Sequence, residues 1–238
     1  MSVPSPTFPS RRPAWRWACL CAGVLLAGLA CALAGGALGG QLYVHASGVL
    51  LIADLSPLLI ALALGSVRSS PALRVATNPL IALPSWAIVL GVWCLPGPYE
   101  AALGHPAVQA LRCATLFVCG LSMWMCLLGV VQGPRWFGGR AKIAGVLGSR
   151  LLGAILANVL LWSDAVFYAS YVEGDALRGL SPLADQNLAG AIVLAQESLL
   201  TLGLLCWLLA RTRPRHGRAH RRGVEPVAGA YAYRQSLP

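Results

Sequence analysis

Six long apolar stretches constrain the fold of this chain more than any other feature. They cover residues 17–39, 45–64, 80–95, 108–131, 143 to 162 or beyond, and 188–210. A helix needs roughly 20 mainly apolar residues to cross a bilayer. Because the stretches are continuous and do not alternate in polarity, β-strands of a barrel are a poor fit. The sequence therefore predicts an all-α bundle of about six transmembrane helices.

The composition agrees with a chain that mostly avoids water. Only 11% of the residues are charged and 57% are hydrophobic, whereas about a quarter of a soluble domain is charged. We predict three parts: a basic N-terminus at 1–16, a membrane bundle at 17–210 and an Arg-rich disordered tail at 211–238.

Basic residues concentrate in alternate loops, which predicts the orientation of the bundle. One side carries Arg11, Arg12, Arg16, Arg68, Arg74, Arg135, Arg140, Lys142 and the arginines of segment 211–222. The other side carries Glu100, Asp164, Glu173, Asp175 and Asp185 with a single Arg178. Lys and Arg favour the cytoplasmic side. We therefore expect both termini in the cytoplasm of a bacterium, with a multi-pass bundle in its inner membrane. This topology also explains the net charge of +10 and argues against nucleic-acid binding.

The first apolar stretch has two interpretations. A basic start, an apolar run and the small residues Ala32-Leu33-Ala34 resemble a cleaved signal peptide. The run is long for a signal peptide, so we favour a retained helix. Cleavage would leave five spans.

Four ionisable residues lie within the apolar stretches, where charge is costly and often functional. Arg112 and Arg150 are near the ends of their stretches, and their simplest interpretation is snorkelling to the membrane surface. Asp54 and Glu197 are deep, and their side chains are too short to snorkel. Two interpretations remain for these carboxyls: each forms a structural hydrogen bond inside the bundle, or each binds a proton or an ion.

Several soft metal ligands are expected near the outer face. They are His45, Cys94, His105 and Cys113. His and Cys ligands suit Cu(I), so these residues form a candidate copper site. The alternative is that the cysteines are small apolar residues and the histidines are interfacial. The sequence contains no nucleotide-binding loop and no familiar hydrolase motif, and we expect a protein that is not an enzyme.

Four segments resemble one family, the CtaG-type (Caa3/CtaG) cytochrome c oxidase assembly proteins. The first runs from His45 to Pro57. The second is WCLPGPYEAAL at 93–103, and the third is GLSMW at 120–124. The fourth comprises Tyr168, Tyr171 and SPLADQNLAG at 181–190. The resemblance covers about 45–209, most of the chain.

The resemblance implies a role in assembling haem-copper oxidases, with their subunits as partners, and handling of copper by histidines near the outer face. This chain departs from the family pattern at several positions. Val49 replaces a second histidine, and Gln109 and Cys113 occupy two further histidine positions. The leading hypothesis is an oxidase assembly factor that holds Cu(I) transiently. The alternatives are a small proton-coupled transporter that uses Asp54 and Glu197, and a scaffold that has lost the metal site.

Overall fold

The computed structural model describes residues 13–36, 40–67, 70–171 and 180–212, and all regular elements in these ranges are helical. The elements are α1 (Ala14–Ala34), α2 (Leu42–Leu50), the π-helical turn η1 (Leu51–Leu55), α3 (Ser56–Leu64), α4 (Pro71–Ala76), α5 (Pro79–Trp93), α6 (Pro96–Gly104), α7 (Pro106–Leu128), α8 (Gly139–Trp162), the 3-10 turn η2 (Ala169–Tyr171) and α10 (Pro182–Thr212). The predicted all-α fold is confirmed. The N-terminal residues 1–12 and the tail from 213 onward lie outside the described residues.

Length and composition identify the helices that can cross a membrane. Among the described residues, five stretches qualify: Ala14–Ala34, Leu42–Leu64, Pro106–Leu128, Gly139–Trp162 and Pro182–Ala210. A sixth crossing exists if Pro79–Trp93 and Pro96–Gly104, which are bent by 72° at their junction, form one broken span. The protein is therefore a multi-pass membrane protein, and five or six segments of its described residues are long and apolar enough to cross a bilayer. The sidedness of the bundle stays a prediction.

Two prolines and a glycine at Pro96-Gly97-Pro98-Tyr99 predict a rigid loop between α5 and α6, and the structure differs from this prediction. These residues instead form the first turn of α6, with Leu95 as its extended N-cap. Proline suits the first turn of a helix, where its missing N–H has no intrahelical partner. The two prolines therefore start a new helix in a new direction.

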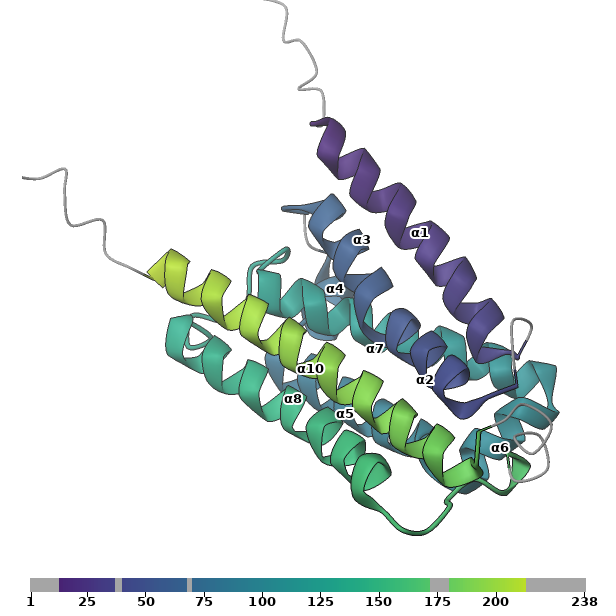
Figure 1. Cartoon of the computed structure of the whole chain (residues 1–238). Helices are drawn as coiled ribbons and strands as arrows, with labels where there is room; N and C mark the ends of the chain where they lie inside the picture. The colour runs from purple at the N-terminus through teal and green to yellow at the C-terminus, as the bar shows by residue number, and fades with distance from the viewer. Residues whose placement is uncertain (1–12, 37–39, 68–69, 172–179, 213–238) are drawn as a thin grey trace, which may run out of the picture.

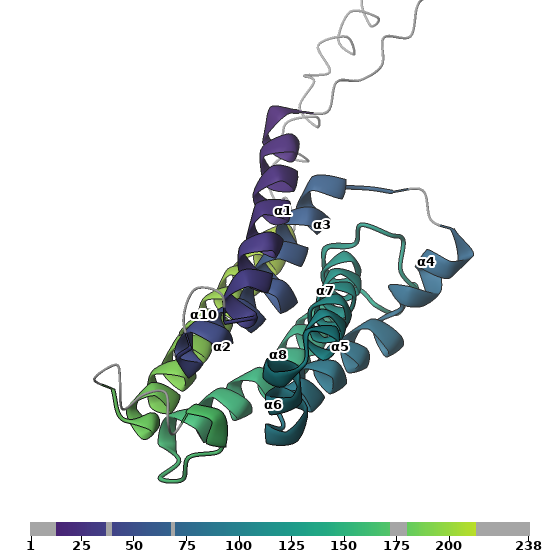
Figure 2. The same ribbon diagram turned by 90° about the vertical axis from the view of Figure 1, so that its right-hand side faces the viewer.

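The helices pack as one bundle (Figure 1). Helix α10 lies along α8 and also contacts α2, while α5 packs between α7 and α8. The continuous run α2–η1–α3 packs against both α1 and α7. Figures 1 and 2 show that α1 begins and α10 ends at the same end of the bundle, with α6 at the opposite end. We call these the terminal end and the α6 end.

The run α2–η1–α3 contains a local distortion next to Pro57. Pro57 lies in the first turn of α3, directly after the π-helical turn η1. It has no N–H to donate to the carbonyl of Ala53, four residues earlier. The indole Nε1 of Trp86 donates to that carbonyl at 3.2 Å. The distortion therefore anchors α5 to η1.

Glycine permits close helix contact at two crossings. A Cβ at Gly120 of α7 would lie 2.1 Å from the carbonyl oxygen of Ala53. A Cβ at Gly190 of α10 would lie 2.8 Å from the carbonyl oxygen of Ala157 on α8. Helices in membranes commonly approach through small residues. These two contacts hold α7 and α10 close to the segments that carry the ionisable residues.

Candidate functional site

A buried ionic cluster occupies the interior of the bundle. Arg150 of α8 donates to both oxygens of Asp54 at 2.8 and 2.9 Å. The Nη1 atom of Arg150 also contacts both oxygens of Glu197 at 3.1 and 3.2 Å. The three side chains are only 1–3% exposed. The structure thus joins η1, α8 and α10 through one guanidinium.

Two tryptophans complete the surroundings of Arg150. The guanidinium carbon lies 5.0 Å from the ring of Trp86 and 5.0 Å from the ring of Trp124. Cations are attracted to indole faces, and more strongly where water is excluded. Arg150 is therefore held by two indole rings as well as by two carboxyl groups. The contact of either tryptophan with Arg150 could not be predicted, since an apolar helix offers no signal for which Trp faces a charge.

The snorkelling interpretation of Arg150 and Arg112 is wrong. Arg150 is 3% exposed and Arg112 is 0% exposed. The Nη2 atom of Arg112 donates to the carbonyl of Ala34 at 2.7 Å, and its guanidinium carbon lies 4.9 Å from the Tyr99 ring. Because Ala34 is the last residue of α1, Arg112 satisfies a carbonyl that the end of that helix leaves free. Both arginines tie helices together.

A cluster of aromatic side chains lies toward the α6 end. We call His45, Tyr99, Tyr168 and Tyr171 the tyrosine cluster. The Tyr171 hydroxyl shares a hydrogen bond with Nδ1 of His45 and donates to the Tyr99 hydroxyl at 3.4 Å. The Tyr168 hydroxyl donates to the carbonyl of Cys94 at 2.8 Å. Burial raises the pKa of both Tyr168 and Tyr171, which lie in the connection between α8 and α10, so these phenols stay neutral.

Asp185 connects the start of α10 to the start of α2. Its carboxylate is 0% exposed, and it accepts hydrogen bonds from the backbone N–H groups of Leu42 and Tyr43. The first N–H groups of a helix lack intrahelical partners and carry partial positive charge. Asp185 therefore caps α2 from another helix and holds His45, one turn further along, in position.

Glu100 and Gln186 hold the connection between α8 and α10. Gln186 accepts from the backbone N–H of Phe167 at 2.9 Å and donates to the carbonyl of Ala165 at 2.9 Å. Glu100 of α6 accepts from the N–H of Ala169 at 2.7 Å. Through these bonds two separate helices position the backbone that carries Tyr168 and Tyr171.

The segments singled out by the sequence therefore meet in space. His45, Tyr99, Glu100, Tyr168, Tyr171, Asp185 and Gln186 come from three of the four segments and form one connected set near the α6 end. The remaining segment contains Gly120 and Trp124, which contact Ala53 and Arg150. The motif residues thus make contacts between helices that lie far apart in the sequence.

The four predicted copper ligands do not converge on one point. In the described part of the chain, no three His, Cys, Asp or Glu side chains are placed to hold a metal ion. His45 bonds to Tyr171, and Cys94 lines a cavity beside Tyr99. Cys113 accepts from Gln109 at 3.5 Å, while His105 is exposed at the N-cap of α7. Among the described residues, these side chains therefore form no centre with three or more metal ligands.

These features define a class of protein: a multi-pass helical membrane protein whose ionisable and aromatic groups are buried between its helices. A family model described as cytochrome c oxidase caa3 assembly factor (Caa3_CtaG) matches residues 6–214, and the chain belongs to this family. The resemblance inferred from the sequence is thereby confirmed. No curated protein and no solved structure matches the chain.

Proposed function

We propose that this protein is a non-enzymatic assembly factor for a haem-copper cytochrome c oxidase in a bacterial inner membrane. The observation that carries the proposal is the family match over residues 6–214. The convergence of the motif residues supports a scaffolding role, because most of their hydrogen bonds go to backbone atoms. Such bonds determine the shape of a surface and do not activate a substrate.

In this proposal, the partner binds at the α6 end of the bundle. Apolar side chains are exposed there, namely Leu95 (55%), Trp162 (76%), Val166 (40%) and Phe167 (36%). Interface centres are enriched in aromatic and apolar residues. Val166 and Phe167 belong to the backbone segment that Gln186 holds. In this proposal, the tyrosine cluster, together with Glu100, Asp185 and Gln186, keeps that surface in a single shape for an oxidase subunit.

The test is deletion of the gene followed by complementation. Oxidase activity and the haem absorbance of membranes should fall in the deletion strain and recover with the wild-type protein. Tyr171→Phe removes the hydroxyl bonded to His45 and should complement poorly, whereas Tyr43→Phe is a matched control on α2 and should complement fully. Oxidase subunits should also co-purify with the protein from native membranes. Normal oxidase content in the deletion strain would refute the proposal.

Copper binding is a more specific prediction than a role in oxidase assembly, and it needs its own experiment. The separation of His45, Cys94, His105 and Cys113 favours a scaffold that has lost the metal site. Copper retained by purified protein should then be equal in the wild type and in His45→Ala. A clear loss of copper in His45→Ala would restore the copper hypothesis. The family match favours assembly over proton-coupled transport.

A further inference from the structure

The ionic cluster contains two carboxyl groups but only one cation. Asp54 on η1 and Glu197 on α10 face one cation, Arg150 on α8. The neighbours on α5 and α7 are the neutral rings of Trp86 and Trp124. With both carboxyls ionised, the cluster would carry one net negative charge in the membrane interior. An uncompensated buried charge is strongly unfavourable, so a single proton would stabilise the cluster.

The geometry distinguishes the two carboxyls. Asp54 receives two parallel hydrogen bonds, from Nη1 at 2.9 Å and from Nη2 at 2.8 Å. This fork-to-fork arrangement is the strongest form of an arginine–carboxylate pair. Glu197 is reached by Nη1 alone, at 3.1 and 3.2 Å. Asp54 is therefore the ionised partner of Arg150, and Glu197 is the carboxyl with capacity for a proton.

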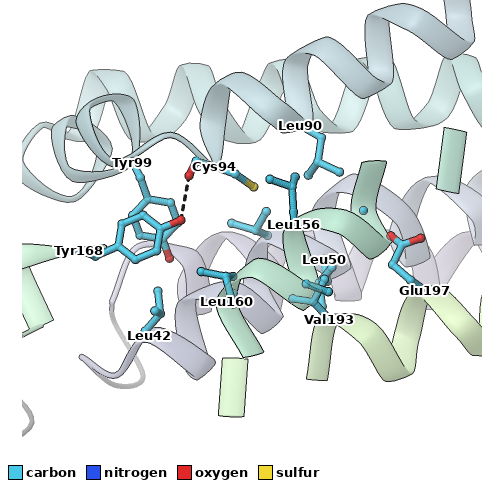
Figure 3. Close-up of a pocket in the computed structure, with 14 residues that line it drawn as sticks. Leu42, Leu50, Leu90, Cys94, Tyr99, Leu156, Leu160, Tyr168, Val193 and Glu197 are labelled. Atoms are coloured by element: carbon cyan, nitrogen blue, oxygen red, sulfur yellow. Dashed lines mark hydrogen bonds between the residues drawn. The ribbon is translucent and has the colours of Figure 1, made fainter. Parts of the chain in front are cut away.

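A small cavity connects Glu197 with the tyrosine cluster. It has a volume of about 50 Å³ and is lined by Glu197, Gly153, Val193, Leu156, Cys94, Tyr99 and Tyr168, among others. Figure 3 shows Glu197 on one side of this space and Tyr99 and Tyr168 on the other. A water molecule needs roughly 10–15 Å³ of such volume, so a few waters fit. Cys94, Tyr99 and Tyr168 are the other titratable groups that line this cavity.

Gly153 makes room for the Glu197 carboxyl beside this cavity. A Cβ at Gly153 would lie 2.8 Å from both Cδ and Oε1 of Glu197. The carboxyl therefore packs directly on the α8 backbone, and its position depends on a residue without a side chain.

We propose that Glu197 is a proton-binding site that exchanges its proton with water at the α6 end through this cavity. The proton comes from water and forms the O–H bond of a neutral carboxylic acid at Glu197. Asp54 and Arg150 remain a charged pair, so the whole cluster is neutral. This site is separate from the proposed assembly role and does not depend on it.

Infrared difference spectroscopy of the purified, full-length protein in lipid tests the site. At neutral pH the wild type should show the carbonyl stretch of a protonated carboxyl, and glutamate labelled with ¹³C at its side-chain carboxyl should shift that band. Glu197→Gln should remove the band. Asp54→Asn should also remove it, because Glu197 would then ionise as the sole partner of Arg150. Absence of the band in the wild type, or its persistence in either variant, would overturn the proposal.

The route is tested by the rate at which this band shifts after transfer to heavy water. Val193→Phe places a larger side chain at the cavity wall and should slow the exchange several-fold. Leu199→Phe is a control on the same helix, at a residue that is 71% exposed, and should leave the rate unchanged. Equal exchange rates in Val193→Phe and the wild type would exclude the cavity as the route. If a variant fails to fold, the infrared band of the labelled wild-type protein still tests whether a carboxyl is protonated.

Discussion

Removing the cation of the ionic cluster should strongly destabilise the protein. We choose Arg150→Met because methionine keeps an unbranched chain between Trp86 and Trp124 while deleting the charge. The variant leaves Asp54 without its two hydrogen bonds at 2.8 and 2.9 Å. Loss of one partner of a buried ion pair costs about 3–5 kcal/mol. For a protein of this size, that corresponds to a fall in Tm of roughly 6–20 °C.

The assay is thermal unfolding in detergent, followed by tryptophan fluorescence. Arg140→Met is a matched control, because Arg140 is exposed in the first turn of the same helix, and its stability should change by no more than about 0.5 kcal/mol. The double variant Asp54→Asn with Arg150→Met also removes the carboxylate that has lost its partner. It should recover much of the lost stability, because the main cost of breaking a buried pair is the charge left behind.

The reasoning is refuted if Arg150→Met matches Arg140→Met in Tm, or if the double variant is less stable than the single one.

Three further predictions follow from individual contacts. Gly120→Ala should cost about 1–3 kcal/mol, because its Cβ would lie 2.1 Å from the backbone oxygen of Ala53, while Gly203→Ala, which meets nothing within 4 Å, should not lower Tm. Asp185→Ala should cost about 1–2 kcal/mol by uncapping α2, again measured as Tm. Burial raises the pKa of Tyr171 in the folded protein. The contribution of the neutral Tyr171 to the free energy of unfolding is therefore complete below the ordinary tyrosine pKa of about 10, and it is lost as the pH rises further. Tyr171→Phe should therefore show a shallower fall of Tm between pH 9 and 11 than the wild type.

The helices could be predicted from the sequence because membrane solvation acts on each segment separately. An apolar stretch of sufficient length must satisfy its own backbone hydrogen bonds, whatever its neighbours are. The α5–α6 junction was not predicted, since two prolines can either form a loop or begin a helix. The bend of 72° between those helices depends on packing that the local residues do not encode.

The environments of the ionisable residues could not be predicted in the same way. Position along a helix indicates depth in the membrane, but not which neighbour the side chain faces. Arg150 meets Asp54 and Glu197 across 96 and 47 residues of chain, so its partners depend on how η1, α8 and α10 pack. The same reasoning explains the candidate copper ligands. His45 and His105 are expected at a similar depth, yet one is buried and the other is exposed.

Two helical segments, α2–η1 and α10, link the ionic cluster to the tyrosine cluster. The run α2–η1 supplies His45 and Asp54, and α10 supplies Asp185 and Glu197. Asp185 joins these two segments by capping α2, and Arg150 joins them again by bonding both Asp54 and Glu197. A helix segment attached at two points cannot slide or rotate without breaking one attachment. The buried charges therefore hold the tyrosine cluster in register, and the shape of the α6 end depends on residues deep inside the bundle.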